Sequence, residues 1–597
     1  MSRSSHPRSN GKHRYNRKQL NWPPLGERTD ELLPRVQGYY ARLCALPRRT
    51  RRALVRQWRR SLSAIALLLA LGQAPALAAT INVDGTACTL IDAITSANTD
   101  AVAGGCPPGN GADTIVLPAG STQLLTAVDN ITLGPTGLPV ITSTVTLRGR
   151  NSTIRRESSA PDFRILAVDS SGDLTLHNTT VSGGYSDRGL LYSGGGVYNS
   201  GILTLTNSTV SGNYVYSGGG GVLNSGTLTL TNSTVSGNSI INHGSGSGGV
   251  FNSGTLTLTN STVSGNRITG LGFGGGGVSN TGTLTLTNST VSGNSANYGG
   301  GGVDNSGTAT LTNSTVSGNF DGGGMHNSGM LTLTNSTVSG NFGGSGGVSN
   351  SGTATLTNST VSGNYVAYYG GGVYNSGTLV LTRALISGNH SALVPEASEV
   401  YTNMTRPPEA IIVANNHNLF GHDGDAGVTG FSPGPTDIVP NVPFGAILKP
   451  LADNGGPTKT HALPVGSPAI GKSPANSGCK PTDQRGVTRP QGAACDIGAF
   501  EKGPPVRCGG RIARILGSLG NNRLIGTPGS DVIHGLAGRD TIDGLEGNDI
   551  ICGGTGNDIL FGDNGADKLN GGSGSDTCRG GTGTDTGVSC ETATSIP

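Results

Sequence analysis

Seven aspartates recur at an interval of nine residues near the C-terminus, each inside a glycine-rich nonapeptide, the first of which starts at Gly526. Carboxylate oxygens are hard ligands, and Ca²⁺ takes six to eight oxygen ligands. Glycine lets the backbone turn so that carbonyl oxygens face the same point as the carboxylate. The spacing therefore predicts a series of calcium sites. The predicted ligands are Asp531, Asp540, Asp549, Asp558, Asp567, Asp576 and Asp585.

These nonapeptides, such as Gly-Gly-Thr-Gly-Asn-Asp-Ile-Leu-Phe, resemble the calcium-binding repeats of RTX proteins. The resemblance implies that two nonapeptides make one turn of a β-roll and that calcium bridges loops 18 residues apart, as from Asp540 to Asp558. The alternative is a glycine-rich acidic tail without metal, which seven copies in register disfavour. The last two copies depart from the pattern, with Cys578 and Gly587 in place of an aliphatic residue.

The composition of this C-terminal segment suits folding that depends on metal. Residues 517–597 carry 11 acidic residues against four Lys or Arg, and few apolar side chains. Without metal the aspartates repel one another, whereas the free energy of calcium binding becomes free energy of folding. We therefore expect residues 507–597 to gain β-structure when calcium is added.

The middle of the chain repeats one unit. From Asn178 to Asn389 nine copies of a motif such as Gly-Thr-Leu-Thr-Leu-Thr-Asn-Ser-Thr-Val-Ser-Gly-Asn follow one another at spacings of 22 to 29 residues. Strict alternation of Leu and Thr indicates strands, and no helical period is present. No proline occurs between Pro161 and Pro395, as expected where each coil donates its amides to the next. The pattern predicts an all-β chain: a right-handed parallel β-helix solenoid followed by a smaller calcium-binding β-roll.

The variable parts of each copy lie on one edge. All extra residues of the longer copies follow Ser-Gly-Asn, so this edge carries loops of varying length, where solenoids usually bind ligands. The Asn-Ser-Thr asparagines are expected to be turn residues stacked in a ladder and to carry no glycans. The outward residue of Val-x-Asn should place Asp304 and His326 on neighbouring coils. That pair could act in acid/base catalysis, but without a nucleophile or metal a chance contact is favoured, and no catalytic residue is assigned.

The N-terminus indicates export. The first 60 residues carry 16 Lys or Arg against three acids, which alone would suit nucleic-acid binding. However, Arg59-Arg60 is followed by the apolar run from Ala64 to Leu71 and by Ala76-Leu-Ala78, the pattern of a signal peptide of the Sec route. The run is too short to span a bilayer. We therefore expect a secreted or cell-surface chain with no nucleic-acid partner and no transmembrane span in its mature form.

Export places the cysteines after Cys44 in an oxidising compartment. None of these eight lies in the repeats of the β-helix, and their positions suggest local pairs that staple the ends of the solenoid and the roll. The expected disulfides are Cys88–Cys106, Cys479–Cys495, Cys508–Cys552 and Cys578–Cys590.

Two flanking segments resemble parts of bacterial β-helix surface proteins. Cys88-Thr-Leu-Ile-Asp-Ala-Ile-Thr-Ser-Ala-Asn98 resembles their "CSLREA" segment, with Ile91 and Asp92 in place of Arg and Glu, and is expected to form a short helix that caps the first coil. Asn418-Leu-Phe-Gly-His-Asp-Gly, with later motifs up to Cys495-Asp-Ile-Gly-Ala-Phe-Glu501, resembles the "choice-of-anchor Q" domain that closes such proteins. The glycine-rich repeats also look like those of chlamydial polymorphic outer-membrane proteins.

The expected order is a basic extension or misassigned start (1–60), a signal peptide core and cleavage site (61–78), a cap with the first coils (79–165), the repetitive β-helix (166–392), a closing domain (393–502), a linker (503–516) and the calcium-binding repeats (517–597). We expect an exported calcium-binding cell-surface or extracellular-matrix protein for adhesion or surface structure. Its expected partners are glycans or cell-surface components, and its oligomeric state stays open. The alternative is an extracellular polysaccharide lyase or hydrolase that acts along the loop edge.

Overall fold

The computed structural model describes residues 78–596 except 187–192, 242–244, 271, 345, 405–409, 476–478, 505 and 518–519. The expected basic extension (1–60) and the signal peptide core (61–77) lie outside the described residues. In the part of the chain that is described, no helix is both long enough and apolar enough to cross a membrane.

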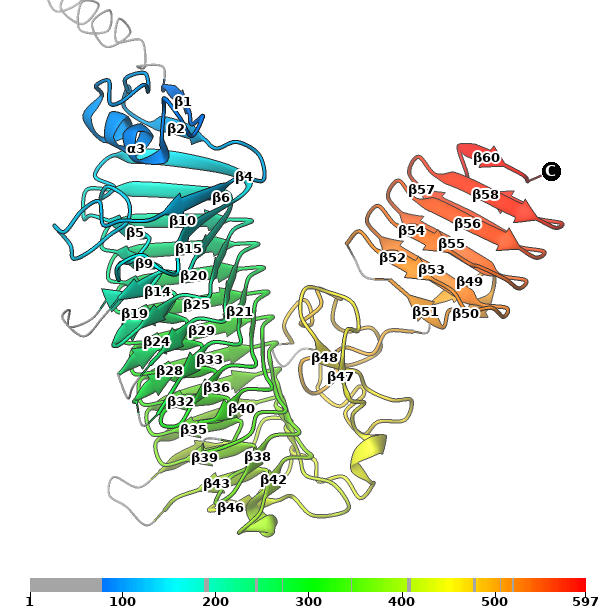
Figure 1. Cartoon of the computed structure of the whole chain (residues 1–597). Coiled ribbons are helices and arrows are strands. Elements are labelled where there is room, and N and C mark those ends of the chain that lie inside the picture. The colour runs from blue at the N-terminus through cyan, green and yellow to red at the C-terminus, as the bar shows by residue number, and fades with distance from the viewer. Residues whose placement is uncertain are drawn as a thin grey trace, which may run out of the picture. The chain divides into compact units, whose positions relative to one another are not determined.

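The structure is all-β, as predicted, and its first part is a parallel β-solenoid (Figure 1, blue to yellow-green). Each repetitive coil contributes three main strands. The Val-x-Asn strands stack into one 11-stranded parallel sheet, so the solenoid has about 11 turns. This sheet contains β5 (Leu166–Val168), β9 (Val197–Asn199), β14 (Val222–Asn224), β19 (Val250–Asn252), β24 (Val278–Asn280), β28 (Val303–Asn305), β32 (Met325–Asn327), β35 (Val348–Asn350), β39 (Val373–Asn375), β43 (Val400–Thr402) and β46 (Val428–Thr429).

The other two strand series belong to one 23-stranded sheet, which begins with β1 (Thr80–Asn82), β2 (Asp113–Val116), β3 (Thr122–Leu125), β4 (Thr144–Arg156) and β6 (Asp173–Ser182). The Thr-Leu-Thr-Leu-Thr series comprises β10 (Ile202–Thr206), β15 (Thr227–Thr231), β20 (Thr255–Thr259), β25 (Thr283–Thr287), β29 (Thr308–Thr312), β33 (Met330–Thr334), β36 (Thr353–Thr357), β40 (Thr378–Thr382) and β44 (Ile411–Val413). The Thr-Val-Ser series comprises β11 (Thr209–Ser211), β16 (Thr234–Ser236), β21 (Thr262–Ser264), β26 (Thr290–Ser292), β30 (Thr315–Ser317), β34 (Thr337–Ser339), β37 (Thr360–Ser362), β41 (Leu385–Ile386) and β45 (Leu419–Phe420).

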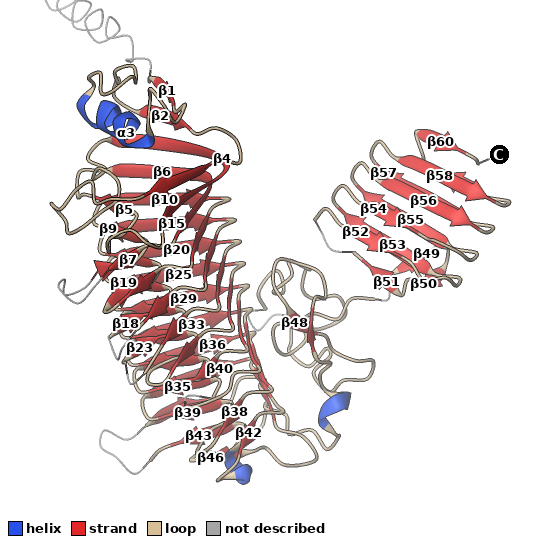
Figure 2. Cartoon of the chain, in the orientation of Figure 1, coloured by secondary structure: helices blue, strands red, loops and turns tan. Residues whose placement is uncertain are grey.

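Alternation within the strands builds the core of the solenoid. Leu228 and Leu230 of β15 and Val235 of β16 are fully buried, and they pair in register with the same residue types one coil later. The threonines between them point outward. Because a coil buries its apolar edge only against its neighbours, stability comes from stacking. Figure 2 shows this stack of strands with loops at its edges.

The Asn-Ser-Thr asparagines are turn residues, as expected, but they do not build the expected ladder. The seven from Asn207 to Asn358, together with Asn178 of the Asn-Thr-Thr copy, have a left-handed backbone with φ between 47° and 52°. That conformation makes the tight bend between two strands and directs most of these side chains toward solvent. Among the described residues only one hydrogen bond joins neighbours in this series, from Asn335 Nδ2 to Asn313 Oδ1 at 3.4 Å.

Two other asparagine series, both buried, form the ladders. In the second series Nδ2 of Asn238 donates to Oδ1 of Asn266 at 2.9 Å, and this oxygen also accepts the backbone N–H of Asn238 at 3.0 Å. The first series is Asn199, Asn224, Asn252, Asn280, Asn305, Asn327, Asn350 and Asn375. The second is Asn213, Asn238, Asn266, Asn294, Asn319, Asn341, Asn364 and Asn389. Hence each coil is joined to the next by side-chain amides inside the solenoid.

The N-terminal end carries the expected cap helix, α3 (Leu90–Thr99). Thr89 caps it by accepting the N–H of Asp92 at 3.2 Å. Leu90, Ala93 and Ile94 are buried toward β2 and β4. Ile91, between them in sequence, is 37% exposed.

The coils of the solenoid continue past residue 392, the expected end of the repetitive β-helix. The strands β43, β44, β45 and β46 continue its sheets as far as Thr429. Among the described residues, Pro395 lies in a connection, the 3-10 helix η1 (Pro395–Ala397) that precedes β43, where no amide is required for the ladder. A proline in the loops is therefore compatible with coils that continue past residue 392.

The described residues of 458–501 then pack on the outward face of the Thr-Val-Ser strands. Thr337 Oγ1 donates to Oε1 of the buried Gln484 at 2.6 Å, and Ala499 donates its N–H to Thr360 Oγ1 at 3.0 Å. Outward side chains that are half-buried in earlier coils are buried here. A buried ion pair, Arg489 with Glu501 at 3.3 Å, lies within this covering segment.

The C-terminal segment is a roll of two five-stranded parallel sheets. Residues 18 apart pair in register, as Ile533 with Ile551 and Ile551 with Leu569. Two nonapeptides therefore make one turn. One sheet contains β51 (Ile515–Leu516), β53 (Val532–Ala537), β55 (Ile550–Thr555), β57 (Lys568–Ser573) and β59 (Thr586–Val588), and the other contains β52 (Arg523–Ile525), β54 (Thr541–Asp543), β56 (Ile559–Asn564), β58 (Thr577–Thr582) and β60 (Thr592–Thr594).

Disulfides join the same four pairs that the sequence suggests, and none lies in the repetitive coils. They are Cys88–Cys106, Cys479–Cys495, Cys508–Cys552 and Cys578–Cys590. Two of the four therefore staple the β-roll, which has only six fully or nearly fully buried side chains in its central core.

Candidate functional site

The motif aspartates of the β-roll stand in two columns, one of Asp531, Asp549, Asp567 and Asp585 and one of Asp540, Asp558 and Asp576. Within a column, Oδ1 of each aspartate accepts the backbone N–H of the aspartate one turn earlier. The bond from Asp540 N to Asp558 Oδ1 is 2.8 Å, and that from Asp549 N to Asp567 Oδ1 is 2.8 Å. These bonds fix every carboxylate at the bend between strands.

The second oxygen of these carboxylates is free for a ligand. Oδ2 is buried and has no hydrogen-bond partner in six of the seven, namely Asp540, Asp549, Asp558, Asp567, Asp576 and Asp585. Asp531 differs, because its Oδ2 accepts the N–H and the hydroxyl of Thr527 at 2.6 and 2.9 Å. A buried anionic oxygen without a partner is costly. Six of the seven predicted ligands therefore offer what a cation needs.

The electrostatics point the same way. Burial raises the pKa of Asp540 and Asp549 to about 6, although each accepts a backbone N–H that opposes the shift. The charge of the aspartate one turn later raises the pKa of each further, Asp558 acting on Asp540 and Asp567 on Asp549. A bound divalent cation would reverse this balance, since it stabilises the ionised form.

Glycines clear the space around the free oxygens. A Cβ on Gly571 would lie 2.6 Å from Asp576 Oδ2, and a Cβ on Gly562 would lie 2.5 Å from Asp567 Oδ2 and 2.6 Å from the carbonyl oxygen of Gly580. In the described residues no three His, Cys, Asp or Glu side chains converge on one point. The roll therefore fits calcium if carboxylates supply part of the oxygens and backbone carbonyls supply the rest.

On the solenoid, Asp304 and His326 stack on neighbouring coils, as predicted. They pair in register, and Asp304 Oδ1 lies 2.7 Å from His326 Nδ1, with side chains 29% and 36% exposed. The next residue of the column is Ser349. Over the described ranges no hydrogen bond joins it to His326, so the pair has an oriented imidazole without an engaged nucleophile.

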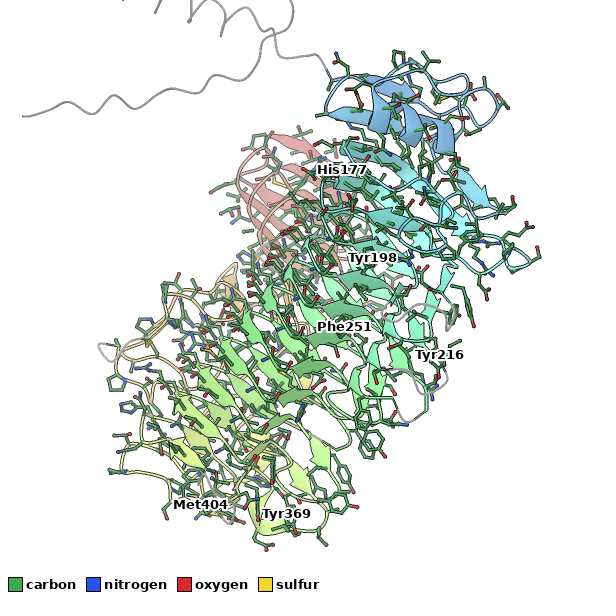
Figure 3. The ribbon with its side chains drawn as sticks, turned by 90° about the vertical axis from the view of Figure 1, so that its left-hand side faces the viewer. His177, Tyr198, Tyr216, Phe251, Tyr369 and Met404 are labelled. Carbon is green, nitrogen blue, oxygen red and sulfur yellow. A yellow bond between two sulfur atoms is a disulfide. The ribbon has the colours of Figure 1, made fainter. Side chains whose placement is uncertain are left out.

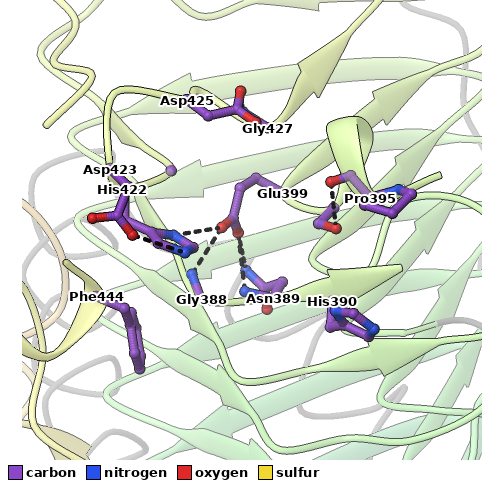
Figure 4. Close-up of a pocket in the computed structure, with 12 residues that line it drawn as sticks. Gly388, Asn389, His390, Pro395, Glu399, His422, Asp423, Asp425, Gly427 and Phe444 are labelled. Carbon is purple, nitrogen blue, oxygen red and sulfur yellow. Dashed lines mark hydrogen bonds and ion pairs between the residues drawn. The ribbon is translucent and has the colours of Figure 1, made fainter. Parts of the chain in front are cut away.

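Sequence reasoning missed a pocket of about 490 Å³ at the C-terminal end of the solenoid (Figure 4). Its central group is the buried carboxylate of Glu399, which accepts the N–H of Gly388 at 2.8 Å and Nδ2 of Asn389 at 2.6 Å. His422 Nδ1 lies 3.8 Å from Glu399 Oε1. Glu399 thus replaces the next asparagine and terminates the second ladder. The sequence signal is an acid ten residues after the last Ser-Gly-Asn, where no further copy follows.

The buried glutamate makes stability depend on pH. Burial raises the pKa of Glu399 from its ordinary 4.5 to about 7, although the hydrogen bonds from Asn389 and Gly388 oppose the shift. Between these values the folded state binds more protons than the unfolded state, so the free energy of unfolding falls as pH rises through this window. We expect a loss of up to about 3 kcal/mol in chemical unfolding followed by circular dichroism.

Glu399→Gln should remove that pH dependence, and Glu396→Gln, which neutralises an exposed neighbour, should keep it. If the free energy of unfolding changed equally with pH in both variants, the pH dependence would belong to another group.

Aromatic rings that are half-buried or exposed lie on the Val-x-Asn sheet and along the loop edge. Figure 3 shows Tyr198 and Phe251 on that sheet and Tyr216 near the loops. Phe273 and Phe342 are exposed and stack on the tyrosine of the next coil, with ring centroids 5.1 and 4.9 Å apart. Apolar rings at solvent are suited to contact with a partner surface.

Comparison with known proteins supports both halves of this description. Residues 164–326 match the family model of the right handed beta helix region, and residues 516–551 and 553–586 match that of the RTX calcium-binding nonapeptide repeat (4 copies). No curated protein matches. A solved structure titled "Crystal structure of pectate lyase Pel9A" is similar at 15% identity, covering 66% of this chain and 92% of that chain, with a TM-score of 0.31. The chain thus carries a right-handed β-helix region and RTX calcium-binding repeats.

Proposed function

We propose that this chain is an exported, calcium-binding cell-surface or extracellular-matrix protein whose β-helix serves adhesion or surface structure without a catalytic role. The observation that carries the proposal is the set of six buried, unpartnered Asp Oδ2 atoms in two columns of the RTX-matched segment. Such weakly bound sites fill at the calcium levels found outside cells, with Kd values of roughly 10⁻⁴ to 10⁻³ M. The four disulfides suit the same compartment.

A surface location is supported by the closing segment. Its motifs resemble the choice-of-anchor Q domain, which ends bacterial β-helix surface proteins before varied anchoring devices. In this chain the β-roll is the device that follows. Glycans or other cell-surface components are the partners that we propose for the solenoid, with the exposed rings of its loop edge as contact points.

Binding to a glycan array, in millimolar calcium and in chelator, tests this function. We expect retention of cell-surface polysaccharides without their cleavage. Phe273→Ala together with Phe342→Ala should weaken retention about tenfold, because aromatic contacts are worth about 0.5–1.5 kcal/mol each. Met330→Ala removes an equally exposed apolar side chain from the threonine face and should leave retention unchanged.

The opposing result would be turnover. Incubation with pectin, alginate and other uronic-acid polymers that released new reducing ends or unsaturated products would establish an enzyme instead, if Asp304→Ala or His326→Ala abolished the release. Equal weakening by the Met330 variant and by the ring variant would remove the loop edge as the contact surface.

A further inference from the structure

The β-roll continues beyond its last nonapeptide. The last nonapeptide ends with β59, which pairs with β57, and the tail after Val588 adds β60, which pairs with β58. Ser589 and Ser595 adopt a left-handed backbone, with φ of 52° and 54°. The carbonyl oxygen of Ser589 faces Gly571, and that of Ser595 faces Gly580. In the same way, the carbonyl oxygens of Gly571 and Gly580 face the glycines one turn earlier. The tail therefore completes the last turn of the roll, and this second half of the turn lacks the nonapeptide sequence.

This second half of the turn supplies its own carboxylate. The backbone N–H of Asp576 donates to Oε2 of Glu591 at 2.6 Å. That is the bond which Asp540 and Asp558 donate to the aspartate one turn later, at 2.8 Å in both cases. Glu591 follows Asp576 by 15 residues rather than 18, and its longer side chain spans the shortened path.

A disulfide holds this carboxylate in place. Cys578 is fully buried in the core of the roll, at the position where the five preceding repeats have an aliphatic residue, and it is bonded to Cys590. Cys590 directly precedes Glu591, so the bond ties the glutamate's backbone to the strand that begins after Asp576. The apparent defect at Cys578 in the sixth nonapeptide is therefore the attachment point of the tail.

We propose that Glu591 is a calcium ligand which completes the last site of the column Asp540, Asp558 and Asp576, and that the Cys578–Cys590 bond positions it. Asp576 has a buried Oδ2 without a partner, like the aspartates that lie between two turns. With Glu591 as the next carboxylate, Asp576 gains the neighbour that Asp558 has in Asp576. The proposal rests on the calcium-binding function given above.

The test is calcium calorimetry on the whole oxidised mature chain, with Glu591→Gln as the variant. We expect one calcium equivalent to be lost or to bind about tenfold more weakly or worse, since a ligand and its charge are removed. The remaining sites should keep their affinity. Glu546→Gln is the matched control, because it removes the same charge from an exposed position of the roll outside both columns, and it should bind as the wild type does.

A second variant separates ligand from position. In Cys578→Ser with Cys590→Ser, Glu591 remains but is no longer held, so we expect the same site to weaken while the others stay filled. Wild-type affinity in the Glu591 variant would overturn the ligand assignment, as would equal loss in the Glu546 variant. Wild-type affinity in the double-cysteine variant would overturn the positioning role. If the wild type binds no calcium at all, the proposed function itself fails.

Discussion

Removal of calcium is expected to unfold residues 517–597 and to leave the β-helix folded. Six buried carboxylate oxygens would then lack a partner, and the small apolar core of the roll offsets little of their desolvation. Limited trypsin digestion followed by mass spectrometry measures this directly. Cleavage after Arg539, Lys568 and Arg579, which lie in the roll, should need a chelator, because a protease requires local unfolding.

Variants of the two aspartate columns sharpen this result. Asp549→Ala together with Asp558→Ala removes one carboxylate from each column and should make the roll sensitive to trypsin even in millimolar calcium. Asp531→Ala is the control. Its Oδ2 already accepts two hydrogen bonds from Thr527, so a smaller effect on trypsin sensitivity is expected. Identical digestion and circular dichroism in chelator and in excess calcium, with no binding heat, would contradict the metal assignment.

Asn266→Ala is expected to destabilise the solenoid by about 3 kcal/mol or more, since each buried polar group left unpaired costs about 1–3 kcal/mol. The substitution leaves the N–H and Nδ2 of Asn238 without their acceptor. It also removes bonds to Val235 O and to Asn294 Oδ1 at 3.0 and 2.9 Å. Urea unfolding followed by circular dichroism should show the transition at a lower urea concentration, with a folded baseline before it that is shorter or interrupted.

The control lies in the same coil. Asn260→Ala changes an exposed turn asparagine with φ of 50°, and only the backbone preference for that conformation is lost, about 1 kcal/mol. Equal destabilisation by both substitutions would show that turn geometry, rather than the buried amide ladder, limits the stability of the coil.

The alternation of Leu and Thr was enough to predict the parallel coils, and the recurring Val-x-Asn motif placed Asp304 beside His326. It could not tell which asparagines form the ladders, because Asn199, Asn207 and Asn213 each follow a short strand and look alike in sequence. Their roles depend on whether the backbone turns the side chain inward or outward. That difference is set by φ, which is left-handed at Asn207.

The candidate site was likewise predicted from the sequence only in part. Regular spacing revealed the aspartate columns, but Asp531 carries the same motif and is occupied by Thr527, a local contact that spacing does not show. Glu399 and Glu591 were missed because each takes the place of a repeated residue at an irregular distance, after a loop or a disulfide. A residue that ends a series does not recur at the spacing of that series, so its role is recognised only in the folded structure.

The asparagine ladders also give the solenoid a direction. Each hydrogen bond from one ladder asparagine to the next runs from Nδ2 to the Oδ1 of the C-terminal coil. The first series therefore starts with Oδ1 of Asn199, which is buried and unpartnered, and the second series ends on the carboxylate of Glu399. Each interior copy receives a bond from one side and offers the same bond to the other. Whole copies can therefore be gained or lost by recombination without disturbing this polarity, each changing the length by about 4.8 Å. Only the two terminal coils, where the ladders start and end, have no equivalent copy. The number of interior copies therefore sets the length of the solenoid.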